Sequence, residues 1–423
     1  MKQLHYASLG ETVYADTLPN GLPLRVISRP DYGKQFAFFA TRYGGMDTRF
    51  QEEDGEWIAT PAGVAHYLEH KLFDTADGTV TQRFAANGAV DNAFTAADMT
   101  GYFFEGTDCF EENLETLLSF VSEPYFTDET VQKEQGIIAQ EIRMNEDDPY
   151  SELYCNVMSM LYYGQPVSTR IAGTVESIAE ITKETLYRCH KTFYRPGNMV
   201  LCVAGNVKPE RVFSIAQDVL TKEYSTSVGG AADSGGIPEI TEHYAEWNMS
   251  VSAPLFNLAI KGAVPERGQC LRCRLIAELA CDVLFGPSSE LYNRLYDEGL
   301  INDSFGGDYE YLPGAAYFLI SGESHDPKRI RDEILAEAQH LAKTGIEQAL
   351  WERLVRAAYG SMVRRLNSLE DTCIELAQSC FDGEDYLKFP EVFQSIEKHD
   401  VEQLLKKWCT EERTVLAVVN PQK

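Results

Sequence analysis

Two histidines in this sequence have the spacing of metal ligands. His66 and His70 lie four residues apart in the stretch TPAGVAHYLEHKLFD at residues 60–74. On an α-helix this spacing puts two imidazoles one turn apart on one face, where both can bind the same metal ion. Glu69, three residues after His66, projects close to the same point. Two nitrogen ligands and a nearby carboxylate form half of a catalytic zinc site.

The segments that would position these residues carry the signals of helices. Thr60 can cap a helix and Pro61 fits its first turn, so we expect a helix from this point through the histidine pair. A second helix is predicted for residues 127–147, TDETVQKEQGIIAQEIRMNED, which begins with capping and acidic residues. Within it Glu134 and Glu141 are two turns apart and so share a face. Either could supply a third ligand, and the spacing does not rank one above the other.

Three motifs resemble the pitrilysin-type zinc metallopeptidases, which are also called inverzincins or the M16 family. They are GVAHYLEHKLF at 63–73, AFTAADMTGYFF at 93–104 and EQGIIAQEI at 134–142. The similarity extends over nearly the whole chain and is greatest to a cytosolic bacterial branch of the family. It implies a zinc-dependent endopeptidase that cleaves short or unfolded peptides in an enclosed chamber.

The resemblance also implies roles for the residues of the two predicted helices. It makes His66, His70 and Glu141 the ligands of Zn²⁺ and Glu69 the general base. Glu134 would hydrogen-bond to a ligand histidine and orient its ring. The implied reaction is attack of an activated water on a peptide carbonyl, with Glu69 taking the proton and passing it to the leaving amine.

The resemblance also implies a substrate-binding role for the segment DNAFT at residues 91–95. In the family this segment is an exposed edge strand to which an extended peptide adds as another strand. Main-chain hydrogen bonds then provide affinity, and pockets for alternate side chains provide preference. We therefore expect Asn92, Ala93 and Phe94 to bind substrate. The alternative interpretation is that Asn92 is a turn residue and that Phe94 belongs to the core.

The chain is too long for one ordinary core and carries signs of a duplication. Residues 176–207 and 394–421 both have the pattern of a helix, a turn and a strand, which indicates an internal repeat. We predict a zinc-binding peptidase domain at 1–223, a Gly-rich linker at 224–238 and an M16-like domain without metal ligands at 239–423. The fold class is α+β. The resemblance implies two similar halves, each an antiparallel sheet with helices on one face, that form a clamshell.

The second half departs from the family pattern. Related peptidases grip substrate there with an Arg and a Tyr seven residues apart. In the corresponding segment, LYNRLYDEGLIND, these positions hold Leu295 and Asn302, and Arg294 is one residue out of register. We therefore expect a homodimer or a heterodimer with a related M16 subunit that carries the Arg and Tyr.

Two functions from other classes are also considered. One is a metal-free or catalytically idle scaffold, against which the intact zinc motif argues. The other is a zinc-dependent peptide-binding subunit without catalysis, which the missing Arg and Tyr would suit.

The charge and composition of the chain limit the classes of partner that it is expected to bind. The net charge of −28 argues against nucleic acid or an anionic membrane as a partner and favours basic peptides. No stretch approaches the roughly 20 apolar residues of a membrane span, and the N-terminal residues have no signal-peptide core, so a cytoplasmic protein is expected. The ten cysteines are then expected to be free thiols.

Overall fold

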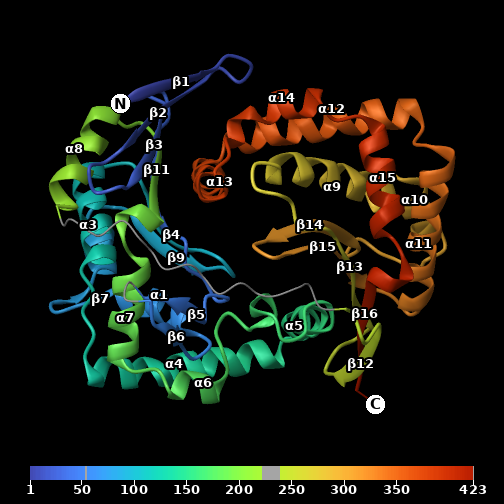
Figure 1. The fold of residues 1–423 in the computed structure, drawn as a ribbon, viewed down its shortest axis with the longest axis horizontal. Coiled ribbons are helices and arrows are strands. Elements are labelled where there is room, and N and C mark those ends of the chain that lie inside the picture. The colour runs from blue at the N-terminus through green and yellow to red at the C-terminus, as the bar shows by residue number, and fades with distance from the viewer. Residues whose placement is uncertain (53–54, 222–238, 423) are drawn as a thin grey trace. The chain divides into compact units, whose positions relative to one another are not determined.

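The computed structural model describes residues 1–52, 55–221 and 239–422, and the chain forms two compact units (Figure 1). The first unit consists of Met1–Ile142, Thr169–Asp233 and Val363–Leu387. The second consists of Arg143–Ser168, Ser234–Met362 and Lys388–Lys423. The predicted linker at 224–238 lies outside the described residues.

The first unit contains a seven-stranded sheet with the order β1-β2-β3-β11-β4-β10-β9. Neighbouring strands are antiparallel except β3 and β11, which are parallel. The central strands β4 and β11 are buried at every position, as expected of strands whose two faces are both covered. The strands are β1 (Lys2–Tyr6), β2 (Glu11–Thr17), β3 (Pro23–Ser28), β4 (Gln35–Thr41), β9 (Val90–Thr95), β10 (Thr100–Gly106) and β11 (Met199–Gly205). Two short hairpins pair β5 (Arg49–Gln51) with β6 (Trp57–Ala59) and β7 (Asp74–Thr75) with β8 (Gly78–Thr79).

Helices of the first unit cover this sheet. They are α1 (Val64–Leu72), α2 (Thr81–Ala86), α3 (Phe110–Ser122), α6 (Val175–Ala179), α7 (Lys183–Phe193), α8 (Pro209–Val219) and α13 (Leu369–Asp382), together with the 3₁₀ helix η2 (Pro196–Asn198). Helix α4 (Asp128–Asp147) begins in the first unit and ends in the second. Apolar residues of α1, α3, α7 and α8 share one core cluster with alternate residues of the central strands, such as Phe39 and Leu201.

The second unit contains a five-stranded sheet with the order β12-β16-β13-β15-β14. Its strands are β12 (Tyr244–Met249), β13 (Leu255–Lys261), β14 (Gly306–Leu312), β15 (Ala315–Glu323) and β16 (Thr414–Pro421). Its helices are α5 (Pro149–Leu161), α9 (Cys270–Phe285), α10 (Glu290–Asp297), α11 (Pro327–Thr344), α14 (Phe389–Gln394) and α15 (Lys398–Trp408), with 3₁₀ helices η1 (Pro166–Ser168) and η4 (Glu411–Arg413). Helix α12 (Gln348–Arg365) begins in this unit and ends in the first, and η3 (Tyr386–Lys388) lies where the chain returns to the second unit.

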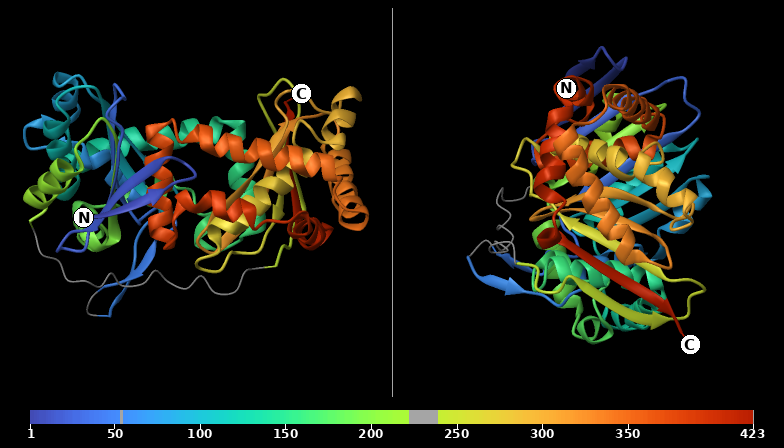
Figure 2. Two further views of the ribbon diagram at one scale, coloured as in Figure 1. Left: turned by 90° about the horizontal axis from the view of Figure 1, so that it is seen from above. Right: turned by 90° about the vertical axis from the view of Figure 1, so that its right-hand side faces the viewer.

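Five strands of the first sheet repeat the topology of the second sheet. In the first, β3 is parallel to β11, and then β4, β10 and β9 follow antiparallel. In the second, β12 is parallel to β16, and then β13, β15 and β14 follow antiparallel. The right-hand view in Figure 2 shows β16, in red, beside β12, in yellow. This repeated topology confirms the internal repeat that the sequence predicts, and with it the α+β fold of two similar units.

Each sheet is also covered by a helix that lies in the other half of the sequence. Helix α13 packs on β11 and β4 of the first unit, and α5 packs on β13 and β16 of the second. The buried residues Phe38 and Cys202 lie outside the core cluster that contains Phe39 and Leu201, because successive residues of a strand point to opposite faces. The compact units therefore differ from the predicted division at 223 and 239 by this exchange of helices, and α13 adds cover to a second face of the first sheet.

Candidate metal centre

Helix α1 carries the two histidines. It begins at Val64, later in the chain than the start predicted at Thr60 and Pro61. Its N-cap is Gly63, with φ of 96°, a left-handed conformation that favours glycine. A Cβ at this position would lie 2.6 Å from the carbonyl oxygen of Ala172, so a larger residue does not fit. The backbone N–H of Thr60 instead donates to the carbonyl of Thr48 at 2.8 Å. His66, Glu69 and His70 nevertheless all lie within the helix, as predicted.

Packing fixes the direction in which α1 presents these side chains. Its buried residues Val64, Leu68 and Leu72 belong to the core cluster of the first unit. The hydroxyl of Tyr67 donates to the backbone carbonyl of Val131, so it ties α1 directly to α4. Since α4 carries both candidate carboxylates, this contact brings them opposite the histidines.

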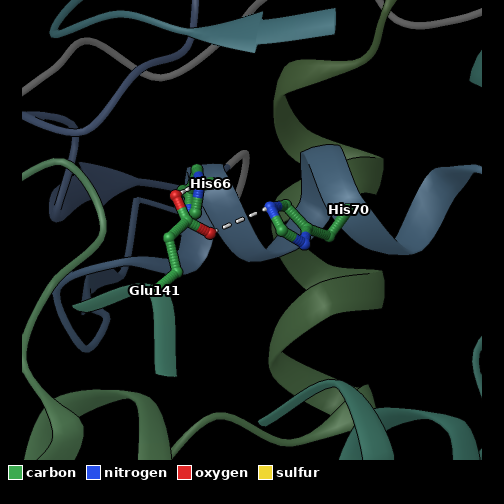
Figure 3. A group of neighbouring side chains, drawn as sticks. All are labelled: His66, His70 and Glu141. Carbon is green, nitrogen blue, oxygen red and sulfur yellow. Dashed lines mark ion pairs between the residues drawn. The ribbon is translucent and has the colours of Figure 1, made fainter. Parts of the chain in front are cut away.

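Glu141 of α4 lies between the two imidazoles (Figure 3). Its Oε1 is 3.3 Å from Nε2 of His66, and its Oε2 is 3.5 Å from Nε2 of His70. The donor atoms of these three residues all lie within 4.8 Å of one another. Ligands at bond lengths of about 2.0–2.1 Å from a tetrahedral zinc lie about 3.3–3.5 Å apart, and the two nitrogen–oxygen separations at this site are of that size. In the described part of the chain no other group of three His, Cys, Asp or Glu side chains meets the same condition.

Glu134 occupies a different position from Glu141. Its Oε1 lies 3.0 Å from Nδ1 of His70, on the side of the ring away from the donor nitrogen. Because an ionised carboxylate only accepts hydrogen bonds, Nδ1 of His70 carries the proton. In the neutral ring the lone pair of Nε2 is then available to a metal ion. The structure thus distinguishes the two glutamates, which sequence spacing could not rank. Glu141 contacts Nε2 of both histidines, and Glu134 contacts Nδ1 of His70, as the roles implied by the resemblance would require.

Electrostatics at the site follow from these contacts. Burial alone would lower the pKa of His70, but the hydrogen bond to Glu134 and the charges of Glu69, Glu134 and Glu141 together raise it above its usual value. The hydrogen bond to His66 lowers the pKa of Glu141. Burial opposes the lowering of the Glu134 pKa, yet the contact with His70 keeps that carboxyl more acidic than usual. Both glutamates are therefore ionised at neutral pH, as ligand and ring acceptor require.

Two further observations concern the surroundings of the histidines. Nδ1 of His66 is buried and has no hydrogen-bond partner among the described residues. Lys71 is fully buried, pairs with Asp74 and lies 3.9 Å from Oε2 of Glu134. A buried ammonium needs such carboxylate partners. Lys71 is not among the predicted site residues, although a lysine directly after a predicted ligand on a largely buried helix is a usable signal.

Glu69, the predicted base, projects from α1 towards the sheet. Its Oε2 accepts a hydrogen bond of 2.6 Å from Oγ1 of Thr95, the last residue of β9. No spacing pattern in the sequence predicts this contact. Strand β9 forms an edge of the seven-stranded sheet, as expected for the DNAFT segment.

The predicted substrate-binding residues differ in their exposure. Asn92 is exposed and lies within β9 rather than in a turn, and its side chain accepts from the backbone N–H of Ala93. Ala93 packs against the core cluster. Phe94 stacks on Phe38 with ring centroids 5.8 Å apart. Asn92 thus presents a polar side chain to solvent at the sheet edge, whereas Phe94 contributes to the packing of one sheet face.

The second unit has no equivalent chemistry at the Arg and Tyr positions. Leu295 is fully buried, and Asn302 donates to Glu323 at 2.9 Å. Arg294 pairs with Glu333 at 2.8 Å. In the part of the chain that the structure describes, no helix is both long and apolar enough to cross a membrane.

Comparisons with known proteins agree with the motif and the fold. The family model for insulinase (peptidase family M16) matches residues 58–175, and the model for the peptidase M16 inactive domain matches residues 180–358. The chain is 35% identical over 435 residues to YmfH of Bacillus subtilis, an uncharacterized zinc protease, and the match covers 100% of both chains. An uncharacterized zinc protease of Mycobacterium leprae is 33% identical over 168 residues, which are 38% of this chain and 37% of that protein.

A crystal structure of an M16-like peptidase from Alicyclobacillus acidocaldarius has a TM-score of 0.92 and 30% identity. It covers 97% of this chain and 99% of the other. With two matching family models and a full-length relative of this similarity, the chain belongs to the M16 peptidase family.

Proposed function

We propose that this protein is a zinc-dependent endopeptidase that hydrolyses short or unfolded peptides. The observation that carries the proposal is the group of three donor residues, His66, His70 and Glu141, whose donor atoms all lie within 4.8 Å of one another. Three protein ligands leave a fourth position open, which is the arrangement of catalytic rather than structural zinc sites. The relatives named zinc proteases support the choice of metal.

Each residue of the site has its own role in the proposed reaction. When bound at such a site, zinc lowers the pKa of a water molecule and polarises a peptide carbonyl. Glu69 accepts the proton of the attacking water and passes it to the leaving amine. Glu134 holds the proton on Nδ1 of His70, so that Nε2 stays available as a donor.

The substrate is proposed to bind as an extended peptide along β9. An edge strand offers unpaired backbone N–H and C=O groups to such a chain. The exposed side chain of Asn92 is suited to hydrogen-bond the peptide backbone. The net charge of −28 favours basic peptides over acidic ones. The cytoplasmic location expected from the sequence is part of this proposal.

A related subunit is a further part of the proposal. Leu295 and Asn302 replace the Arg and Tyr that the family resemblance places in the second half, and Arg294 is already paired with Glu333. We propose that a second M16 subunit, in a homodimer or a heterodimer, supplies the substrate-gripping pair. Full activity would then need that partner, and zinc binding would not.

The test combines metal content with cleavage of a quenched fluorescent peptide library. We expect one zinc per chain, and hydrolysis that is lost in Glu69→Gln while zinc content is retained. Glu105→Gln is a matched control, because Glu105 forms an exposed ion pair with Lys34 on the same sheet. Retained hydrolysis by Glu69→Gln would remove Glu69 from its role. Zinc without hydrolysis in the wild type would favour the partner-dependent form of the proposal, to be tested by adding candidate subunits.

A further inference from the structure

We propose that Thr95 is a positioning residue that fixes the carboxylate of Glu69 for proton transfer. The inference rests on the proposed function, because it concerns the base of that reaction. It is carried by the 2.6 Å hydrogen bond between Oγ1 of Thr95 and Oε2 of Glu69. Among the described residues this is the one hydrogen bond to the Glu69 carboxylate.

The chemistry of the two groups sets the direction of this bond. An ionised carboxylate accepts hydrogen bonds only, so the threonine hydroxyl is the donor. A short O–H···O⁻ contact of this kind is charge-assisted and stronger than a bond between neutral groups. It engages one lone pair of Oε2 and leaves Oε1 without a hydrogen bond among the described residues, so Oε1 is the oxygen that we expect to accept the proton. Thr95 therefore selects which oxygen acts and where it lies.

Thr95 is suited to this role because its own position is fixed. It pairs with Thr100 across the β9–β10 hairpin, and the backbone N–H of Ala96 donates to the carbonyl of Met99 at 2.7 Å. Thr100 is fully buried, and its hydroxyl donates to the carbonyl of Tyr43 at 2.8 Å. A β-branched side chain on such a backbone has few χ1 rotamers. The donor is thus held by the sheet rather than by the flexible end of a side chain.

Glu69 needs such support more than the ligand residues do. His66 and His70 are restrained by the metal once it binds, and His70 is restrained by Glu134 in addition. Glu69 is only partly buried and has three rotatable side-chain bonds, whose ordering has an entropic cost. A base acts efficiently only when it is within hydrogen-bond reach of the proton that it removes. Loss of the Thr95 hydroxyl should therefore lower turnover without changing the binding of substrate or zinc.

The experiment compares Thr95→Val, Thr95→Ala and Thr95→Ser in the full-length zinc-loaded protein, with its partner subunit if activity needs one. We expect kcat to fall by about 10- to 100-fold in Thr95→Val and Thr95→Ala, the range for loss of a hydrogen bond to a charged group. Thr95→Ser keeps the hydroxyl and should stay within about 3-fold of the wild type, with KM and zinc affinity unchanged in all three. Thr12→Val is the matched control, since Thr12 lies in β2 of the same sheet, far from β9 in strand order, and its hydroxyl contacts His5.

The outcomes separate this inference from the proposed function. Wild-type kcat in both Thr95→Val and Thr95→Ala would overturn the inference, while inactivity of Glu69→Gln would leave the proposed function intact. A loss in Thr95→Ser equal to that in Thr95→Val would show that packing, not the hydroxyl, matters, and would also overturn it. Activity in Glu69→Gln would overturn both. Equal zinc affinity and thermal unfolding in all variants would show that a fall in kcat is not a folding defect.

Discussion

Replacing Glu134 by alanine should weaken zinc binding without removing any atom that contacts the metal. In the wild type, Oε1 of Glu134 accepts from Nδ1 of His70 at 3.0 Å. The alanine variant loses this acceptor, so the ring of His70 is free to rotate and its two nitrogens compete for the proton. Glu134→Gln keeps a neutral acceptor at the same place and should preserve part of the orientation.

The magnitude follows from the type of hydrogen bond that is lost. A bond to a charged acceptor contributes about 1.5–3 kcal/mol, which corresponds to about a 10- to 100-fold change in the dissociation constant. Outer-shell partners of metal-binding histidines have effects of about the same size. A neutral amide acceptor retains about 0.5–1.5 kcal/mol, so Glu134→Gln should lose about 3- to 10-fold less affinity than Glu134→Ala.

The assay is competition for zinc against a chromophoric chelator, carried out at one pH and one ionic strength. Glu105→Gln is again the control, because its exposed carboxylate contacts Lys34 and lies outside the metal centre. We expect zinc affinity to decrease in the order wild type, Glu134→Gln, Glu134→Ala. Equal affinity of all three proteins would refute the assigned contact, and a loss as large as that of His70→Ala would assign Glu134 to the metal itself.

Three further predictions concern stability. Burial and the charge of Asp98 raise the pKa of Asp47 from 3.8 to about 7, although the hydrogen bond from the backbone N–H of Gly44 opposes this shift. Between these two pH values the native state holds a proton that the unfolded state has released. The free energy of unfolding should therefore fall as the pH rises from about 4 to 7. Asp47→Asn should remove this pH dependence and raise the unfolding free energy at pH 8 by about 2 kcal/mol. This is about half of the free energy that corresponds to the full pKa shift, because Asp47 is partly exposed. Chemical denaturation at pH 5 and pH 8 tests the sign of the effect. Gly44→Ala should lower the melting temperature, since its Cβ would lie 2.4 Å from the backbone of Ala97, and a melting temperature equal to that of the wild type within the error of the measurement would contradict this. Zinc at a hundredfold excess over its dissociation constant should stabilise the wild type by about 2.7 kcal/mol, and thermal unfolding with and without zinc should show no such gain in His66→Ala.

The sequence predicts those parts of the site that depend on local spacing. His66, Glu69 and His70 belong to one helix, so their common face follows from helical periodicity alone. Glu134 and Glu141 share a face in the same way, but their different roles depend on how α4 crosses α1, which involves packing between distant segments. The family resemblance supplied the ranking that spacing lacked, and the contacts of both residues agree with it.

Long-range contacts account for what the sequence did not predict. The hydrogen bond from Thr95 to Glu69 joins the end of a strand to a helix of different local pattern, and no periodicity relates them. The start of α1 at Gly63 depends on the approach of Ala172, far along the chain. The amphipathic pattern of α13 predicts a buried face but does not say which of two similar sheets it will cover.

The exchange of α5 and α13 has a consequence for synthesis of the protein. A ribosome completes every strand of the seven-stranded sheet long before it makes Leu369–Asp382, the helix that covers β4 and β11. Until then Phe38, Cys202 and their neighbours on that face have no cover, in a nascent chain that is prone to aggregation. We therefore expect that residues 1–223 do not fold on their own, and that their expression alone yields an insoluble product that co-expression of the remaining chain rescues.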